Sequence, residues 1–133
     1  MQTTVKDEMS RLTTSIPMSS TLDQAEKIMA SHNLHCLPVF DNANQCFGVI
    51  SNIDLTRWRD FKLNFRKRQV WEVCTLPVIE VSQNLSVIEA AELMVANTVH
   101  HLIVSQENVV IGILSSMDVI RLFILEGKTG NRV

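Results

Sequence analysis

The chain has 133 residues, a formal net charge of −2 and three cysteines, and 46% of its residues are hydrophobic. This composition allows a buried core and excludes an intrinsically disordered chain, and the small net charge gives no overall attraction to nucleic acid or membranes. No apolar run of about 18 residues is available to span a bilayer, and the first residues lack the apolar core of a secretory signal. Three widely spaced cysteines favour free thiols in a reducing cytoplasm over disulfides or structural zinc.

The sequence repeats itself at a spacing of about 65 residues. Met29 and Met94 lie 65 residues apart, and beyond residue 41 the spacing falls to 64, as it does for Asp54 and Asp118. A one-residue deletion in a turn explains the change, because turns tolerate changes in length. The duplication predicts two halves with one fold. The predicted segments are a first repeat at 1–58, a linker at 59–69, a second repeat at 70–127 and a tail at 128–133.

The first half opens with the short extended segment TTSIPMS, in which Pro17 indicates the edge of a sheet. A helix is predicted next, because Thr21 and Gln24 have the spacing of a capping box. Asn33 is a residue that can end this helix in a left-handed conformation. The apolar residues recur at helical spacing, namely at Leu22, Ala25, Ile28 and Met29.

The segments HCLPVF and CFGVIS are short, apolar and rich in residues that favour strands, and the polar turn DNANQ joins them into a predicted hairpin. A second helix is predicted to begin at Ser51, with Leu55, Trp58 and Phe61 on one face. The order in this half is therefore strand, helix, strand, strand, helix.

The linker RDFKLNFRKRQV contains neither glycine nor proline, and we expect it to be ordered and partly helical. Its surroundings combine basic residues with aromatic ones, which is the pattern of a nucleic-acid surface but also that of a solvated helix face with aromatic rings on the core. We favour the second interpretation. The residues concerned are Arg57, Arg59, Lys62, Arg66, Lys67 and Arg68, with Trp58, Phe61 and Phe65 between them.

The second half repeats these signals. PVIEVSQN is extended, and Ser86 and Glu89 have the spacing of a capping box. HHLIVS and VVIGILS form the predicted hairpin, and a final helix is predicted from Ser115 to Gly127. The apolar residues of its two helices are Val87, Ala90, Leu93 and Met94, then Val119, Leu122 and Phe123.

Each half contains a box of the form glycine, two apolar residues, serine, two variable residues, aspartate: GVISNID and GILSSMD. One interpretation is a helix N-cap, in which the serine caps the helix and the aspartate suits the positive end of its dipole. The other is a ligand site, because a helix N-terminus binds anions and a carboxylate accepts hydrogen bonds from a ribose diol. Gly48 and Gly112 would let a backbone or a flat base approach. The local pattern leaves both interpretations open.

Taken together, these motifs resemble a pair of cystathionine-beta-synthase-type (CBS) domains joined as a Bateman module. The resemblance rests on the repeated element order and on HCLPVFD before GVISNIDL and HHLIVS before GILSSMDV, and it covers about residues 5 to 125. It implies an α+β fold of tandem CBS repeats, β-α-β-β-α twice, packed with pseudo-twofold symmetry and enclosing a cleft. It also favours the ligand interpretation of the two boxes.

The resemblance implies an adenosine-containing regulatory ligand such as AMP, ADP, ATP or S-adenosylmethionine, with no required cofactor. Asp54 and Asp118 would hold the ribose hydroxyls, and Ser51 and Ser115 would support the ribose or phosphate. The residues that it implies for the base opposite Asp118 are Leu12, Thr13, Thr14 and Leu34, and those opposite Asp54 are Pro77, Val78, Ile79 and Val99.

The resemblance also implies that His35, His100 and His101 reach phosphates, where many members of the family have arginine or lysine. A histidine is only partly charged at neutral pH, so we expect weak or pH-sensitive phosphate binding, or a ligand with few phosphates. Strand neighbours point to opposite faces, so at most one of His100 and His101 lines a given pocket. A zinc site at His32, His35 and Cys36 would need a ligand from the other half, and we do not predict one.

The sequence contains no glycine-rich phosphate loop, GxSxG elbow or HExxH motif, so we predict a regulatory module and not an enzyme. The resemblance implies a homodimer formed through helices, and the apolar stretch VIRLFIL is the expected contact. A regulated protein partner is expected, without nucleic acid or membrane. The alternative is a structural dimerisation module with no nucleotide ligand, whose boxes are caps alone.

Overall fold

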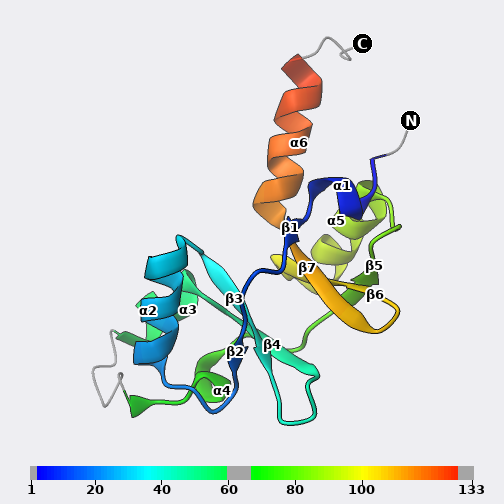
Figure 1. The fold of residues 1–133 in the computed structure, drawn as a ribbon. Coiled ribbons are helices and arrows are strands. Elements are labelled where there is room, and N and C mark those ends of the chain that lie inside the picture. The colour runs from blue at the N-terminus through cyan, green and yellow to red at the C-terminus, as the bar shows by residue number, and fades with distance from the viewer. Residues whose placement is uncertain (1–2, 60–66, 129–133) are drawn as a thin grey trace. The chain divides into compact units, whose positions relative to one another are not determined.

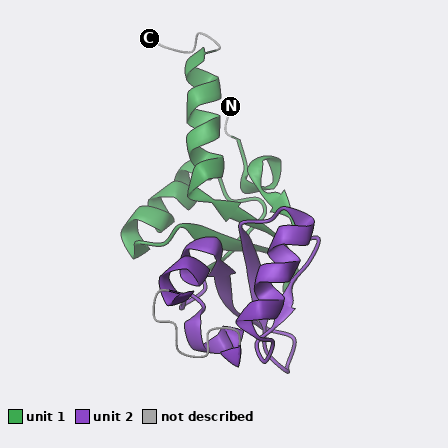
Figure 2. Cartoon of the chain, turned by 90° about the vertical axis from the view of Figure 1, so that its left-hand side faces the viewer, with its two compact units in different colours: residues 1–12, 79–133 green, residues 13–78 purple. Residues whose placement is uncertain are grey.

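The computed structural model describes residues 3–59 and 67–128, whose helices and strands are drawn in Figure 1. The chain forms two compact units, shown separately in Figure 2: unit 1 contains Met1–Leu12 and Ile79–Val133, and unit 2 contains Thr13–Val78. Both are mixed α+β, and both repeat the predicted order of strand, helix, strand, strand, helix. None of the helices in the two described stretches is long and apolar enough to cross a bilayer.

Unit 2 contains a three-stranded sheet in the order β2-β3-β4, with β2 parallel to β3 and β3 antiparallel to β4. Leu37, Pro38 and Val39 are buried in succession, as expected of a strand covered on both faces. The hairpin predicted for this half is confirmed. The elements are β2 (Ile16–Pro17), α2 (Leu22–His32), β3 (Cys36–Phe40), β4 (Cys46–Ser51), α3 (Asn52–Arg59) and α4 (Val70–Val73).

Unit 1 contains a four-stranded sheet in the order β1-β7-β6-β5. Strands β6 and β7 form the predicted antiparallel hairpin, β5 runs parallel to β6, and β1 adds to the far edge antiparallel to β7. The elements are α1 (Val5–Glu8), β1 (Ser10–Arg11), β5 (Glu80–Ser82), α5 (Val87–Asn97), β6 (His101–Gln106), β7 (Val109–Ser115) and α6 (Ser116–Lys128).

The two repeats exchange their leading segments. The first repeat begins with α1 and β1, but these lie in unit 1, where the Val5 N–H donates to the Leu85 carbonyl at 2.8 Å. The second repeat begins with α4, but α4 lies in unit 2, where the Val70 N–H donates to the Ser20 carbonyl at 2.7 Å. The predicted repeat boundaries describe the duplicated sequence, whereas packing divides the chain after residues 12 and 78.

Each unit has its own hydrophobic core, and the exchanged segments belong to it. Val70 and Val73 of α4 are buried in unit 2, and Val5 of α1 is buried in unit 1. Full burial of one such side chain stabilises a fold by about 1.5–3 kcal/mol. The remaining core of unit 2 is Ile16, Leu22, Ala25, Met29, Leu37, Val39, Ile50 and Leu55, and that of unit 1 is Val81, Ala90, Met94, Leu102, Val104 and Leu114.

The predicted helix caps are confirmed with one difference. The Thr21 hydroxyl accepts from the Gln24 N–H at 3.2 Å and the Thr21 N–H donates to the Gln24 amide oxygen at 2.9 Å, which is a full capping box. Asn33 ends α2 in the left-handed region, at φ 53°. At α5 the Ser86 hydroxyl caps the Glu89 N–H, but the Glu89 carboxylate accepts from that same hydroxyl, at 3.2 Å, in place of the backbone.

The second helices differ from expectation at their ends. Both begin one residue after the serine, which is the last residue of the preceding strand. The predicted stop at Gly127 is wrong, because Gly127 lies within α6, which the structure describes as far as Lys128. Val119, Leu122 and Phe123 do share a face, but Phe123 is 75% exposed. In the linker, Arg59 belongs to α3, and residues 60–66 lie outside the described part of the chain.

Candidate functional site

The box in unit 2 is a reciprocal cap at the start of α3. The Asp54 N–H donates to Ser51 Oγ at 3.2 Å, while the Ser51 N–H and hydroxyl donate to Asp54 Oδ2 at 2.9 and 3.1 Å. These bonds satisfy two backbone donors that a helix start leaves without partners. They also fix the direction of the Asp54 carboxylate, because its partner Ser51 lies three residues earlier, in the turn that begins the helix.

Asp54 has a second partner that comes from the exchanged segment. Thr75 forms an isolated bridge with Val49 of β4, with N···O distances of 2.8 and 3.2 Å. This bridge brings the Thr75 hydroxyl to 3.3 Å from both carboxylate oxygens of Asp54, to which it donates. Asp54 is only 6% exposed, so these bonds replace most of the water that a free carboxylate would bind.

Cys74 lies beside this carboxylate. Partial burial and, to a smaller extent, the negative charge of Asp54 together raise the pKa of the Cys74 thiol to about 11. The thiol is therefore protonated at neutral pH and is a poor nucleophile. The pKa of this thiol therefore reflects its burial first and the charge of Asp54 second.

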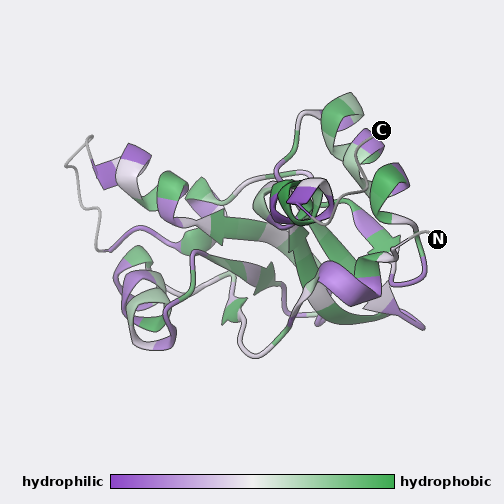
Figure 3. Cartoon of the chain, turned by 90° about the horizontal axis from the view of Figure 1, so that it is seen from above, coloured by the Kyte–Doolittle hydropathy of each residue, from purple (hydrophilic) through white to green (hydrophobic). Residues whose placement is uncertain are grey.

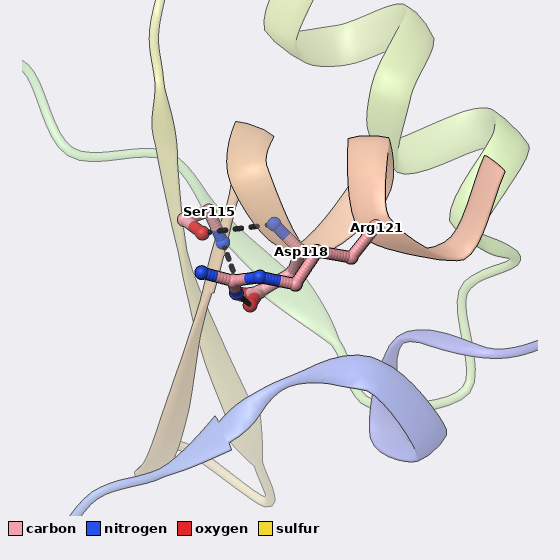
Figure 4. Close-up of polar contacts among 3 residues, drawn as sticks. All are labelled: Ser115, Asp118 and Arg121. Carbon is pink, nitrogen blue, oxygen red and sulfur yellow. Dashed lines mark hydrogen bonds and ion pairs between the residues drawn. The ribbon is translucent and has the colours of Figure 1, made fainter. Parts of the chain in front are cut away.

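The box in unit 1 has the same cap with a different second partner (Figure 4). The Ser115 N–H donates to Asp118 Oδ2 at 2.8 Å, and the Asp118 N–H donates to Ser115 Oγ at 3.1 Å. The other oxygen, Asp118 Oδ1, accepts from Arg121 Nη1 at 3.3 Å. The Arg121 side chain is 69% exposed and that of Asp118 only 13%, so the ion pair has one solvated and one largely covered member.

Gly48 and Gly112 make room for the exchanged segments. A Cβ at Gly112 would lie 2.6 Å from the Ser10 carbonyl oxygen, and a Cβ at Gly48 would lie 2.9 Å from the Thr75 carbonyl oxygen. Side chains do not approach a backbone so closely, so any larger residue would displace the segment. Of the two sequence interpretations, a nearby backbone or a nearby base, the structure shows a nearby backbone.

The predicted phosphate-binding histidines lie next to the caps of their own units. The His35 carbonyl accepts from the Asn52 N–H and the His100 carbonyl from the Ser116 N–H, both at 2.9 Å, at the first residues of α3 and α6. The His35 and His100 side chains are exposed, whereas His101 is partly buried. His100 precedes β6, whose first residue is His101, and the assignment of these histidines to a phosphate remains a prediction.

The residues predicted to contact a base divide between the units. Leu12 belongs to unit 1 together with Asp118, and Pro77 and Val78 belong to unit 2 together with Asp54. The other residues assigned to Asp118, namely Thr13, Thr14 and Leu34, belong to unit 2, and those assigned to Asp54, namely Ile79 and Val99, belong to unit 1. The assignments that join the two units remain predictions.

Sequence reasoning missed two contacts of the carboxylates. Thr75 stands 65 residues after Ser10, and a hydroxyl at both positions was the available signal. Arg121 stands 64 residues after Arg57, and it lies one helical turn beyond Asp118. Asp118 and Arg121 have opposite charges at i,i+3 spacing, which predicts a contact on one side of a helix.

The basic and aromatic cluster makes contacts within the chain. Arg59 pairs with Glu26, and Arg68 lies 5.4 Å from the centre of the Trp58 ring and 3.6 Å from Glu72. Trp58 packs against the core of unit 2, as the helix-face interpretation predicts. Four members of the cluster lie outside the described residues: Phe61, Lys62, Phe65 and Arg66.

The cysteines are free thiols, as predicted. Within residues 3–59 and 67–128, no three histidine, cysteine, aspartate or glutamate side chains are grouped as metal ligands. His32 Nδ1 instead lies 3.1 Å from the Ile28 carbonyl at the end of α2.

Comparison with known proteins decides the family. The family model of the CBS domain matches residues 5–60 and again residues 70–125. The chain belongs to the CBS domain family. This confirms the family resemblance seen in the sequence, and the two matches correspond to the two repeats that exchange leading segments.

Relatives of this CBS pair include much longer enzymes of Methanocaldococcus jannaschii. Inosine-5′-monophosphate dehydrogenase is 32% identical over 76% of this chain, and L-aspartate semialdehyde sulfurtransferase is 28% identical over 91% of it. The chain spans about a fifth of the length of these enzymes, 20% and 23%.

A solved structure shares nearly the whole fold. The CBS domain pair of protein MJ0100, in complex with 5′-methylthioadenosine and S-adenosyl-L-methionine, superposes with a TM-score of 0.82 at 26% identity. The match covers 95% of this chain and 99% of that one.

Proposed function

We propose that this CBS pair is a regulatory module that binds an adenosine-containing ligand, of the class of AMP, ADP, ATP, S-adenosylmethionine or methylthioadenosine. The observation that carries the proposal is the match to the CBS pair of MJ0100, which was solved with two adenosine derivatives. We assign the ribose to Asp54 and Asp118. The module itself needs no cofactor and performs no reaction.

The chemistry of the caps supports this assignment. A carboxylate can accept about four hydrogen bonds, and the cap occupies one oxygen, Oδ2, in each unit. The other oxygen, Oδ1, accepts from Thr75 at Asp54 and from Arg121 at Asp118, and its second lone pair suits a ribose hydroxyl. The cap fixes the carboxylate before a ligand arrives, so little conformational entropy is lost on binding.

The two sites favour ligands of different charge. Arg121 at Asp118 is a permanent cation that can turn toward a phosphate, whereas Asp54 has only the Thr75 hydroxyl. We also assign His35, His100 and His101 to the phosphate of a phosphorylated ligand, and a ligand without phosphate such as methylthioadenosine would make no use of them.

Ligand binding would regulate a second protein by favouring one arrangement of the module over another. We propose that the module works as a homodimer in the cytoplasm, and that its regulated partner is another protein. The ligand must stabilise the arrangement that it prefers, in proportion to its concentration above its Kd.

Isothermal titration of the full chain with methylthioadenosine, S-adenosylmethionine, AMP, ADP and ATP tests the proposal. We expect heat of binding for at least one of them, a rise in melting temperature, and loss of binding in Asp54→Asn or Asp118→Asn. Absence of both heat and melting shift at about millimolar ligand contradicts it, since millimolar affinity is the weakest that would be informative.

A structural dimerisation module is the second candidate, because the cap alone accounts for both boxes. Under this function the Asp54→Asn and Asp118→Asn proteins lose stability but have no binding to lose. The two candidates are separated by the same titrations, because only the first predicts heat from the wild-type chain.

A further inference from the structure

The Thr75 hydroxyl uses the same acceptor that the proposed function assigns to a ribose. It lies 3.3 Å from both carboxylate oxygens of Asp54 and donates to them. A ribose hydroxyl would approach this carboxylate with the same kind of donor, an O–H group. Thr75 belongs to the exchanged segment and not to the box, so the chain itself supplies a donor that competes with a ligand.

The two carboxylates differ in the number of donors that they already accept. Among the described residues, Asp54 accepts from three, namely the N–H and the hydroxyl of Ser51 and the hydroxyl of Thr75. In the same part of the chain Asp118 accepts from two, the backbone N–H of its cap and Arg121 Nη1. Because a carboxylate has room for about four hydrogen bonds, Asp118 can take both hydroxyls of a ribose diol, whereas Asp54 can take only one.

The competing donors also differ in how easily they leave. Thr75 is held by its backbone, which bridges Val49 with N···O distances of 2.8 and 3.2 Å, and its carbonyl oxygen would lie 2.9 Å from a Cβ at Gly48. Its hydroxyl can leave Asp54 only by rotation about χ1, which is restricted in a β-branched side chain. The Arg121 side chain is 69% exposed and can turn into water at little cost.

Apolar surroundings strengthen the Thr75 contact. Val49 and Ile50 of β4 are buried, and the strands of both units are largely hydrophobic (Figure 3). Asp54 itself is buried, whereas Asp118 is half-buried. A hydrogen bond to a charged group gains strength where water is excluded. The Thr75 hydroxyl is therefore a stronger competitor for the carboxylate than water or an exposed side chain would be.

The first repeat shows that the fold does not require this contact. Ser10 is the residue equivalent to Thr75 and takes the same place beside its strand, opposite Ile113. Its side chain also has a hydroxyl, yet Ser10 is exposed, and Asp118 accepts from Arg121 in its place. The contact at Thr75 is therefore a property of this box and not of the fold.

We propose that Thr75 is an internal competitor that weakens binding at Asp54, so that an adenosine-containing ligand fills the Asp118 site first. The Thr75 hydroxyl must turn away before Asp54 can accept both ribose hydroxyls, and the apparent Kd of that site rises as the fraction of molecules with a free carboxylate falls. This proposal rests on the proposed function for the ribose assignment, and it adds the order of filling and the residue that sets it. The module then responds to ligand over two ranges of concentration.

Isothermal titration of the full chain with methylthioadenosine tests the order of filling. This probe has no phosphate, so an attraction between phosphate and Arg121 does not enter the comparison. AMP takes its place if it gives no heat. We expect two binding events in the wild type, with Kd values that differ at least about tenfold, because a hydrogen bond to a charged group must be given up at one site only. Asp118→Asn should remove the tighter event and Asp54→Asn the weaker one.

Thr75→Val is the decisive variant, because it removes the hydroxyl and keeps the shape of the side chain. We expect it to lower the Kd of the weaker event about tenfold, although the protein loses stability. A contact that served stability alone would give no gain in affinity. Ser10→Ala removes the equivalent hydroxyl and is the matched control, which should change neither Kd. Circular dichroism checks that each variant is folded, and Thr75→Ala replaces Thr75→Val if that variant is not.

The possible results separate this proposal from the proposed function. Two events of equal Kd in the wild type, loss of the tighter event in Asp54→Asn, or no gain in affinity from removing the Thr75 hydroxyl overturns the order of filling and leaves the proposed function standing. If the wild type shows the tighter event alone, the weaker one should appear in Thr75→Val. Absence of heat from both probes and from the other adenosine compounds overturns the proposed function, and the order of filling falls with it.

Discussion

The two units hold one cap motif in different surroundings. In unit 2 Asp54 is 6% exposed and its second partner is the neutral Thr75, whereas in unit 1 Asp118 is paired with Arg121, which is 69% exposed. A buried carboxylate with a neutral partner is held mainly by its hydrogen bonds, but an exposed cation can exchange its partner with little cost. The difference shows that residues outside the motif decide how strongly its carboxylate is held.

The exchanged segments of the two units also differ in how they are attached to their sheets. In unit 1, β1 joins the sheet through two ladder positions, Ser10 with Ile113 and Arg11 with Gly112. In unit 2 the equivalent segment forms a single bridge, between Thr75 and Val49. One junction is therefore mainly a backbone contact, while the other also depends on the Thr75 side chain.

The largest expected effect comes from closing the space at the glycines. Gly112→Ala should lower the free energy of unfolding by about 3 kcal/mol and Gly48→Ala by about 2, because overpacking forces backbone shifts and the carbonyl at Gly112 is closer. Denaturation in urea measures both. Cys74→Ala should partly restore Gly48→Ala, since Cys74 Sγ would lie 2.8 Å from the new Cβ. Equal losses at the two glycines would break the distinction between the junctions.

The next effect concerns Cys74, which stands where the first repeat has Met9. With a pKa of about 11, its thiol should have about 100-fold less thiolate at pH 8 than a thiol of pKa 9, because thiolate falls tenfold per pKa unit. Alkylation by iodoacetamide as a function of pH measures this, in a chain with Cys36→Ser and Cys46→Ser. Asp54→Asn should lower the pKa of the Cys74 thiol. An alkylation midpoint near pH 8.5 in the parent chain would contradict the burial of this thiol beside Asp54.

Removing the carboxylates should separate the two caps. Asp54→Ala should cost about 2 kcal/mol of stability and Asp118→Ala about 1, because both lose a cap but only Asp54 leaves buried donors without acceptors. Thr75→Val is the control. It should lower the free energy of unfolding by less than Asp54→Ala does, and adding it to Asp54→Ala should lower that free energy no further. A larger loss at Asp118 would reverse the comparison.

The smallest effect is expected at the exposed ion pair. Arg121→Ala should change stability by less than about 0.5 kcal/mol, since an exposed pair is screened by water and salt. Arg57→Ala, at the matching position of α3, is the reference. Should Arg121→Ala weaken phosphate-containing ligands while Arg57→Ala does not, the arginine acts on the ligand and not on the fold.

Much of the fold was predictable because its signals are local. The box at Thr21 and Gln24, the left-handed Asn33 and both hairpins depend on residues within a few positions of one another. The serine-aspartate caps are of the same kind, at three residues' separation. Helical spacing also placed Leu55 and Trp58 on the core side of α3.

The rest depended on contacts far apart in the sequence. Thr75 reaches Asp54 across 21 residues, and no pattern in the sequence places the segment after the linker against β4. The exposure of Phe123 could not be read from periodicity either, because an apolar face looks the same whether it meets a core or a partner. The glycine signal was also misleading, because Gly127 lies within α6.

The exchange of leading segments has a consequence for the origin of this molecule. A progenitor with one repeat would have held Val5 or Val70 on its own polypeptide, but the core that buries this valine would have belonged to another molecule. Such a progenitor could complete its fold only by exchanging leading segments with a second copy of itself, as domain-swapped dimers do. Gene fusion would then have turned an encounter between two polypeptides into a permanent feature of one.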